Sequence, residues 1–249
     1  MLWRGAGREL PALRAESGAG GDDAAALPKV RVAAFDVDQT LVSTRDGTWA
    51  KSADDWQPLN AHVKRTLERL HARGYVVALF STQNSIRGAL SGKRATMVKS
   101  RFDQIIGHYG VPALAFAATQ KGDKDPCGFR KPRRGMWDFF VRTALGGREP
   151  DMDASFFVGD AAGRPSDHSA DDRGFAEAAG LRFLLPEEAF GGGGLDEVLG
   201  EDAGAAPVAE VEATADDGAA TGGAKGAAAV EVVELSSDED ERLLRENTP

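Results

Sequence analysis

Five short apolar runs, separated by segments of helical periodicity, constrain the fold of this chain more than any other feature. They are VRVAAF just before Asp36, YVVALF (75–80), ALAFAA (113–118), SFFVG (155–159) and LRFLL (181–185). Continuous apolar strands are typical of parallel sheets with both faces covered, and strands that alternate with helices form such sheets. We therefore expect an α/β fold, with a parallel sheet of about five strands and helices on both faces.

The segments between these runs carry helix signals. Asn60 can cap a helix that ends at Gly74. A second helical face lies within 93–109 and stops at Gly110, and GMWDFFVRTAL (135–145) predicts a third helix.

Charge and composition divide the chain into three parts. Residues 1–28 are rich in Gly and Ala, with 3 basic and 4 acidic side chains, and we interpret them as a flexible arm. Residues 29–190 hold 24 basic and 20 acidic side chains and form the expected domain. Residues 191–249 hold 3 basic and 15 acidic side chains and almost no large apolar ones, which predicts a disordered acidic tail.

The cellular context is only partly indicated by the sequence. Cys127 is the single cysteine, so no disulfide can form within the chain, as is usual in a reducing compartment. No apolar run approaches the roughly 20 residues that span a bilayer, so we expect no membrane association. An organelle-targeting function for the arginines near the N-terminus, Arg4, Arg8 and Arg14, stays an open alternative.

Polar residues that can take part in a reaction or bind a cation gather where the predicted strands end. In parallel α/β sheets such positions meet at one edge and build the functional site. Two carboxylates one residue apart repel each other, and a protein usually avoids this unless a cation or a reaction uses them. The residues at or after the strand ends are Asp36, Asp38, Ser81, Thr82, Lys131 and Asp160.

These residue types suit hydrolysis of a phosphate ester. Asp36, Asp38 and Asp160 offer the oxygen ligands that Mg²⁺ prefers. One carboxylate can attack phosphorus, and a second can protonate the leaving oxygen and later deprotonate water. A strand-end hydroxyl, from Ser81 or Thr82, can hydrogen-bond a phosphoryl oxygen, and the Lys131 ammonium can neutralise phosphoryl charge.

The order of these residues resembles that of the haloacid dehalogenase superfamily, which implies a Rossmannoid fold with a small cap or none. Longer blocks resemble the polynucleotide kinase 3′-phosphatase family over roughly 30–190. They are TRDG (44–47), DDW (54–56), FSTQ (80–83), FRKPRRGMWD (129–138) and FFVGDAAGRPSDHSADDRGFAEAAGL (156–181). Members of that family remove phosphate from the 3′ ends of broken DNA.

The resemblance implies a role for each site residue. Asp36 would be the nucleophile and Asp38 the general acid and base. Mg²⁺ would be held by Asp36, by the backbone carbonyl of Asp38 and by Asp160. The expected substrate-binding residues are Ser81, Thr82, Arg87, Arg130 and Lys131, with Ser81 and Lys131 on the phosphoryl group and the arginines on the DNA backbone.

The sequence departs from the family pattern at two places. Gln39 stands where the family usually has Gly, and we expect activity to survive this change. The loop NSIRGALSGK (84–93) matches the family's glycine-rich loop only loosely. No GxxxxGK[ST] motif occurs, so we expect a stand-alone phosphatase without kinase activity.

Other residues have structural interpretations that we prefer. Trp56 and Trp137 could stack on a base, but packing in the core or a loop is the more common role. Asp167 and Asp172 match the family's DxSxxDR stretch, and we expect them to order the metal-binding loop rather than to bind the metal.

The acidic tail contains a short β-prone segment at 230–241 that resembles a SUMO-interacting motif. Val232, Val233 and Leu235 would add a strand to the edge of the partner's sheet, and the acidic residues behind them would meet a basic rim. Ser236 and Ser237 precede acidic residues and are candidate phosphorylation sites. The alternative is a solvated tail that aids solubility or mimics DNA.

Three functional hypotheses follow. The first is a Mg²⁺-dependent DNA 3′-phosphatase, monomeric and nuclear, that acts in strand-break repair. The second is a related hydrolase of a small phosphomonoester. The third is a catalytically dead adaptor that binds SUMO, although Asp36, Asp38, Lys131 and Asp160 are all intact.

Overall fold

The computed structural model describes residues 28–45, 49–86, 92–119, 128–191 and 195, together with the backbone of residues 2–3. Arg87, Cys127 and the segment 230–241 lie outside the described residues, so the predictions made for them stay predictions.

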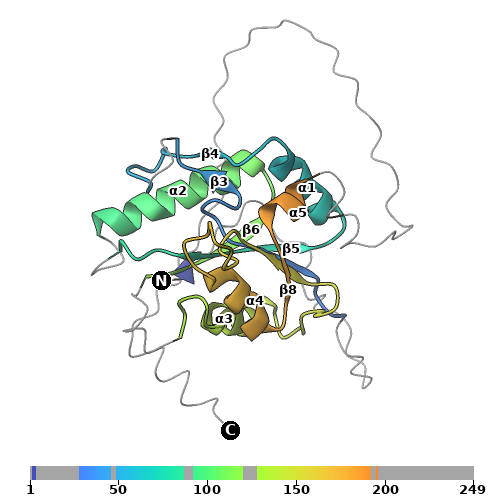
Figure 1. The fold of residues 1–249 in the computed structure, drawn as a ribbon. Coiled ribbons are helices and arrows are strands. Elements are labelled where there is room, and N and C mark those ends of the chain that lie inside the picture. The colour runs from blue at the N-terminus through green and yellow to red at the C-terminus, as the bar shows by residue number, and fades with distance from the viewer. Residues whose placement is uncertain are drawn as a thin grey trace, which may run out of the picture.

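The core of the domain is a six-stranded sheet with the order β1-β6-β5-β2-β7-β8 (Figure 1). Its five main strands are mutually parallel, as the sequence predicts. Strand β1, Leu2–Trp3, pairs antiparallel with β6 at one edge. The sequence did not indicate a strand in this part of the expected N-terminal arm. The parallel strands are β2 (Val32–Phe35), β5 (Val76–Thr82), β6 (Ala113–Ala118), β7 (Phe156–Val158) and β8 (Arg182–Leu184).

Helices cover both faces of the sheet, which confirms the predicted α/β architecture (Figure 1). On one face lie α1 (His62–Ala72), α2 (Lys93–Tyr109) and α5 (Pro186–Phe190). On the other lie α3 (Gly135–Ala144) and α4 (Asp171–Ala179).

The first helix begins one residue later than predicted, because Ala61 and not Asn60 is the N-cap of α1. The Oδ1 atom of Asn60 accepts the backbone N–H of His62 at the start of α1. Gly110 follows α2 with a φ of 68°, a left-handed conformation that glycine adopts without a steric penalty.

Alternating side chains of the strands divide the core into two layers. In β2, Ala33 and Phe35 pack toward α1, α2 and α5, whereas Val32 and Ala34 pack toward α3 and α4. Phe80 of β5 centres the second layer, in ring contact with Trp137 and other aromatic side chains. Trp137 is buried there and Trp56 packs against the first layer, so both have the structural role preferred from the sequence.

The connection from β2 to α1 carries a second, two-stranded sheet of β3 (Val42–Ser43) and β4 (Gln57–Pro58). Strands β3 and β4 are the only strands in the described part of this connection, consistent with a small cap or none.

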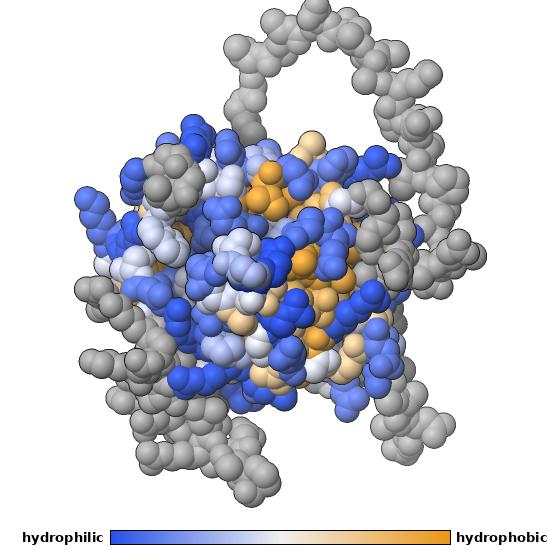
Figure 2. Space-filling view, viewed as in Figure 1, coloured by the Kyte–Doolittle hydropathy of each residue, from blue (hydrophilic) through white to orange (hydrophobic). Residues whose placement is uncertain are grey.

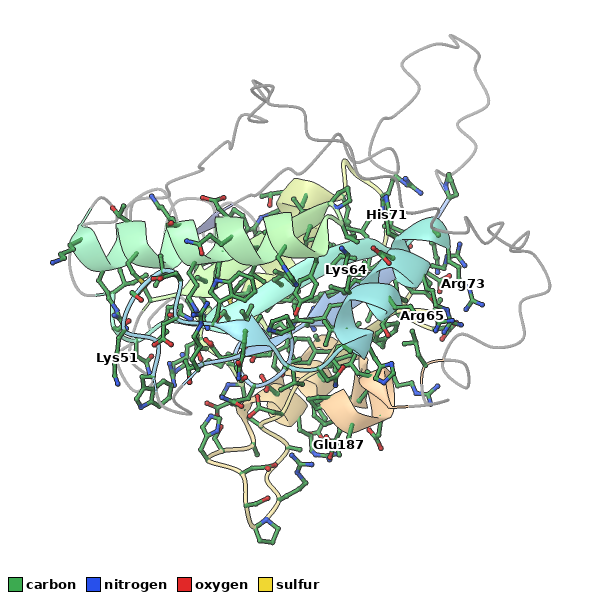
Figure 3. All side chains as sticks on the ribbon, turned by 90° about the horizontal axis from the view of Figure 1, so that it is seen from above. Lys51, Lys64, Arg65, His71, Arg73 and Glu187 are labelled. Carbon is green, nitrogen blue, oxygen red and sulfur yellow. The ribbon has the colours of Figure 1, made fainter. Side chains whose placement is uncertain are left out.

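The surface is predominantly hydrophilic, with hydrophobic residues gathered along the middle of the face in Figure 2. Basic side chains occur on separate parts of it: Lys51 lies far from Lys64, Arg65 and Arg73, which belong to α1 and its end (Figure 3). Within the described part of the chain, no helix has the length and apolar character needed to cross a bilayer.

Candidate active site

The site begins with a tight turn directly after β2. The backbone N–H of Asp36 donates to the carbonyl of Val158 in β7, so the nucleophile candidate is still held by the sheet. Beyond Asp38, Gln39 has a φ of 60°, in the left-handed region that favours glycine. This conformation explains why glycine suits that position, and the structure shows that Gln39 adopts it here.

Lys131 forms the buried centre of the site. Its Nζ atom lies 2.6 Å from Oδ1 of Asp36 and 2.6 Å from Oδ1 of Asp172. All three side chains are buried. Lys131 comes from the loop before α3 and Asp172 from the first turn of α4, so the ammonium joins the end of β2 to the second helical layer.

Burial and charge shift the pKa values of this cluster. Burial lowers the pKa of Lys131, but the carboxylates of Asp172 and Asp36 outweigh it and raise that pKa overall, so the lysine is a permanent cation. Burial raises the pKa of Asp36 well above its usual value, and the neighbouring carboxylates add to this rise whereas Lys131 opposes it. The cluster therefore holds more negative charge than one lysine offsets.

Three carboxylates converge at the edge of the cluster. One oxygen each from Asp36, Asp160 and Asp172 lie within 4.8 Å of one another. Burial, followed by repulsion from Asp172, raises the pKa of Asp160 to about 6. The Oγ1 atom of Thr40 donates to Oδ1 of Asp160 at 3.4 Å. Hard oxygen donors with uncompensated charge fit a divalent cation such as Mg²⁺.

Asp38 is held apart from this cluster. Its Oδ1 atom accepts from Nη2 of Arg101 at 2.7 Å, and its Oδ2 atom accepts from Nε2 of Gln83 at 3.3 Å. The Gln83 amide also donates to Oγ of Ser81 at 2.9 Å. A predicted acid–base residue and a predicted phosphate-binding hydroxyl thus share one partner.

Of the other predicted substrate-binding residues, Ser81, Thr82 and Arg130 are among those that the structure describes. Ser81 and Thr82 form the last two residues of β5, rather than following it, and Ser81 is buried. The guanidinium of Arg130 donates to Oδ1 of Asn84 and lies 3.8 Å from a carboxylate oxygen of Asp171.

Asp167 organises the loop that follows Asp160. Its Oδ2 atom accepts the backbone N–H groups of Ala162 and Arg164, each at 3.0 Å. The hydrogen bond from the Arg164 side chain lowers the pKa of Asp167 to about 2. Arg164 also reaches Glu187, labelled on α5 in Figure 3. Asp167 therefore orders this loop, whereas Asp172 contributes a carboxylate to the acidic cluster that could hold a metal.

Gly159, between β7 and Asp160, leaves room for the Asp172 carboxylate. A Cβ atom at position 159 would lie 2.5 Å from Cγ of Asp172, closer than side chains tolerate. Asp172 is anchored there by Lys131 and by the backbone N–H of Ala161, which donates to Oδ2 at 3.0 Å.

We expect Gly159→Ala to displace Asp172 and lower the free energy of unfolding by about 1–3 kcal/mol, the usual cost of overpacking. Gly107→Ala, in α2, is the matched control: its added Cβ meets no atom within 4 Å. The free energy of unfolding of this control should be about 0.5–1 kcal/mol higher than that of the wild type, because alanine favours the helical conformation more than glycine does. Urea unfolding of the two variants measures both effects, and equal stabilities would contradict the steric argument.

The sequence of this chain matches a known protein family. The family model for the polynucleotide kinase 3 phosphatase matches residues 31–190. The polynucleotide 3′-phosphatase ZDP of Arabidopsis thaliana is 38% identical in an alignment of 169 positions, which covers 64% of this chain and 24% of that protein. The bifunctional polynucleotide phosphatase/kinase of Schizosaccharomyces pombe is 38% identical over 158 residues, 63% of this chain and 36% of that protein.

A shorter relative is matched over most of its length. The polynucleotide 3′-phosphatase of Saccharomyces cerevisiae is 28% identical in an alignment of 210 positions, which covers 66% of this chain and 88% of that protein. Among solved structures, the chain is similar to D,D-heptose 1.7-bisphosphate phosphatase from B. bronchiseptica, with a TM-score of 0.47 and 21% identity over 63% of this chain and 80% of that one.

The chain spans only 24% and 36% of the length of the A. thaliana and S. pombe relatives. Because the family model covers residues 31–190, which hold the whole carboxylate and lysine cluster, the chain belongs to the polynucleotide kinase 3 phosphatase family.

Proposed function

We propose that this protein is a Mg²⁺-dependent polynucleotide 3′-phosphatase that removes the 3′-phosphate from DNA strand breaks during repair. The observation that carries the proposal is the Lys131 ammonium, 2.6 Å from Asp36, the carboxylate that follows β2 in a family-matched domain. A nucleophile held against a buried cation is placed to attack a phosphoryl group whose charge the same cation offsets.

In the first step, an oxygen of Asp36 attacks the phosphorus atom. The bond between phosphorus and the 3′ oxygen breaks, and Asp38 gives its proton to that oxygen, which leaves as a hydroxyl group. The product is an aspartyl phosphate on Asp36 and free DNA. Lys131 and the hydroxyl of Ser81 stabilise the charge on the phosphoryl oxygens.

In the second step, Asp38 removes a proton from a water molecule. The water oxygen attacks phosphorus, the bond to Asp36 breaks, and inorganic phosphate leaves. Asp38 now carries the proton needed for the next cycle, so the two steps together consume one water molecule and restore the enzyme.

Mg²⁺ would be held by the carboxylates of Asp36 and Asp160, and Asp172 lies close enough to support it. When bound, the metal would neutralise charge on the phosphoryl group and orient it. The buried, mutually repelling carboxylates favour this interpretation, because a divalent cation offsets the charge that Lys131 leaves.

A nucleic acid is favoured as substrate by the names of the relatives and by charge. The domain at 29–190 has an excess of basic side chains, in contrast to the acidic chain as a whole. Arg130 lies next to Lys131 in sequence and contacts Asn84 in the loop after β5. We also propose a nuclear location, on the basis of the family and the acidic tail, and binding of SUMO through that tail stays a prediction.

We expect the wild-type protein with Mg²⁺ to release phosphate rapidly from a nicked DNA duplex that carries one 3′-phosphate. Asp36→Asn should reduce this rate at least about 10³-fold, because the amide cannot form the intermediate. Asp153→Asn, at an exposed position, is the matched control and should keep full activity.

The same assay with p-nitrophenyl phosphate separates the alternatives. Turnover of the small ester without turnover of DNA would favour a phosphatase of small molecules. Absence of turnover with both substrates would favour an adaptor whose acidic tail is the functional part.

We also expect Mg²⁺ to stabilise the protein against thermal unfolding, by about 2.7 kcal/mol at 100 times its dissociation constant. In Asp160→Asn this stabilisation should largely disappear, because a ligand is lost. Without Mg²⁺ the variant should be at least as stable as the wild type, since one repelling charge is removed. Scanning calorimetry with Mg²⁺ or with EDTA tests this, and an unchanged Mg²⁺ shift in the variant would contradict the assignment.

A further inference from the structure

We propose that Arg101 is a positioning residue for the reaction, because its ion pair holds the Asp38 carboxylate in the place from which it exchanges protons. The inference rests on the proposed function, in which Asp38 serves as acid and then as base. Arg101 lies in the middle of α2, outside the sequence blocks and strand ends that mark the rest of the site.

The two partners have very different surroundings. The Arg101 side chain is 3% exposed, whereas the Asp38 side chain is 38% exposed. The cation is therefore fixed inside the protein, and the carboxylate it holds faces solvent at the edge of the site. With an Nη2–Oδ1 distance of 2.7 Å, the pair has the short, charge-assisted geometry of a strong hydrogen bond.

Position 101 is one where an apolar side chain would be expected. Val98, Phe102 and Ile105 are buried along the same face of α2 and belong to the first core layer. A buried guanidinium there costs desolvation energy, and its Nε atom has no hydrogen-bond partner among the described residues. Such a pair does little for stability compared with a well-packed apolar residue. Among the described residues, the ion pair with Asp38 is what distinguishes this arginine from a core residue.

A second donor completes the restraint on Asp38. Gln83, just after β5, donates to Oδ2 while Arg101 donates to Oδ1, so each carboxylate oxygen has its own donor. The two donors come from different elements and together define both side-chain torsions of Asp38. A half-exposed aspartate without them would rotate freely, and a misplaced acid–base group slows proton transfer.

The test uses two variants of Arg101: Arg101→Met, which suits the apolar surroundings, and Arg101→Lys, which keeps the charge. Lys99→Met is the control, because it makes the same charge change on the same helix. Thermal unfolding first establishes that each variant folds. On 3′-phosphate DNA, Arg101→Met should lower kcat about 10- to 100-fold with KM within about twofold, as expected when proton transfer is impaired. Arg101→Lys should restore part of the loss, and Lys99→Met should match the wild type.

Rapid mixing with p-nitrophenyl phosphate gives the decisive readout. Nitrophenolate leaves without a proton, so formation of the aspartyl phosphate should be nearly normal in Arg101→Met. Hydrolysis of that intermediate still needs Asp38 as base and should become limiting. We expect a burst of nearly one p-nitrophenol per enzyme, followed by slow turnover, and a smaller effect of the same kind in Gln83→Ala.

The outcomes separate the inference from the function on which it rests. Absence of turnover in the wild type overturns the proposed function itself. With an active wild type, normal kcat in Arg101→Met overturns the positioning role. A raised KM with normal kcat assigns Arg101 to substrate binding instead. A burst that shrinks in parallel with the steady-state rate and the unfolding temperature shows a merely structural role, which also overturns the proposal.

Discussion

The buried contact of Lys131 with Asp36 and Asp172 is the interaction on which the rest of the site depends. Two carboxylates could not be held together in the interior without a cation between them, and removing one partner of such a cluster typically costs about 3–5 kcal/mol. The same contact fixes three chain segments: the turn after β2, the loop before α3 and the first turn of α4. Gly159 is required because Asp172 must approach the end of β7 to take part.

The sheet order brings these segments to one place. Strand β2 lies between β5 and β7, so the ends that carry Asp36, Ser81 and Asp160 are neighbours although they are far apart in the sequence. A site at the carboxyl ends of adjacent parallel strands is the usual solution in α/β proteins. This arrangement also gives the carboxylates different partners: Asp36 and Asp160 belong to the acidic cluster, whereas Asp38 is bound by Gln83 and Arg101.

The sequence was sufficient to predict the residues whose position follows from strand periodicity. Asp36, Asp38 and Asp160 follow apolar runs, and Lys131 lies in a block that resembles the family. Arg101 was not predicted, because it interrupts an apolar helical face without any local motif, and its partner is 63 residues away. The approach of Asp172 to Asp36 was not predicted for a similar reason, since it depends on the bare Cα of Gly159 and not on the sequence neighbours of Asp172.

The two helical layers have a consequence for how this protein can change in evolution. Lys131 precedes α3 and its partner Asp172 lies in the first turn of α4, whereas Arg101 lies in α2 on the opposite face of the sheet. Substitutions that alter the packing of one layer therefore act mainly on the residues that this layer supports. If the proposed roles hold, substitutions in α2 can alter the position of Asp38 while the contact of Lys131 with Asp36 and Asp172 is kept, so that proton transfer and phosphate binding evolve separately.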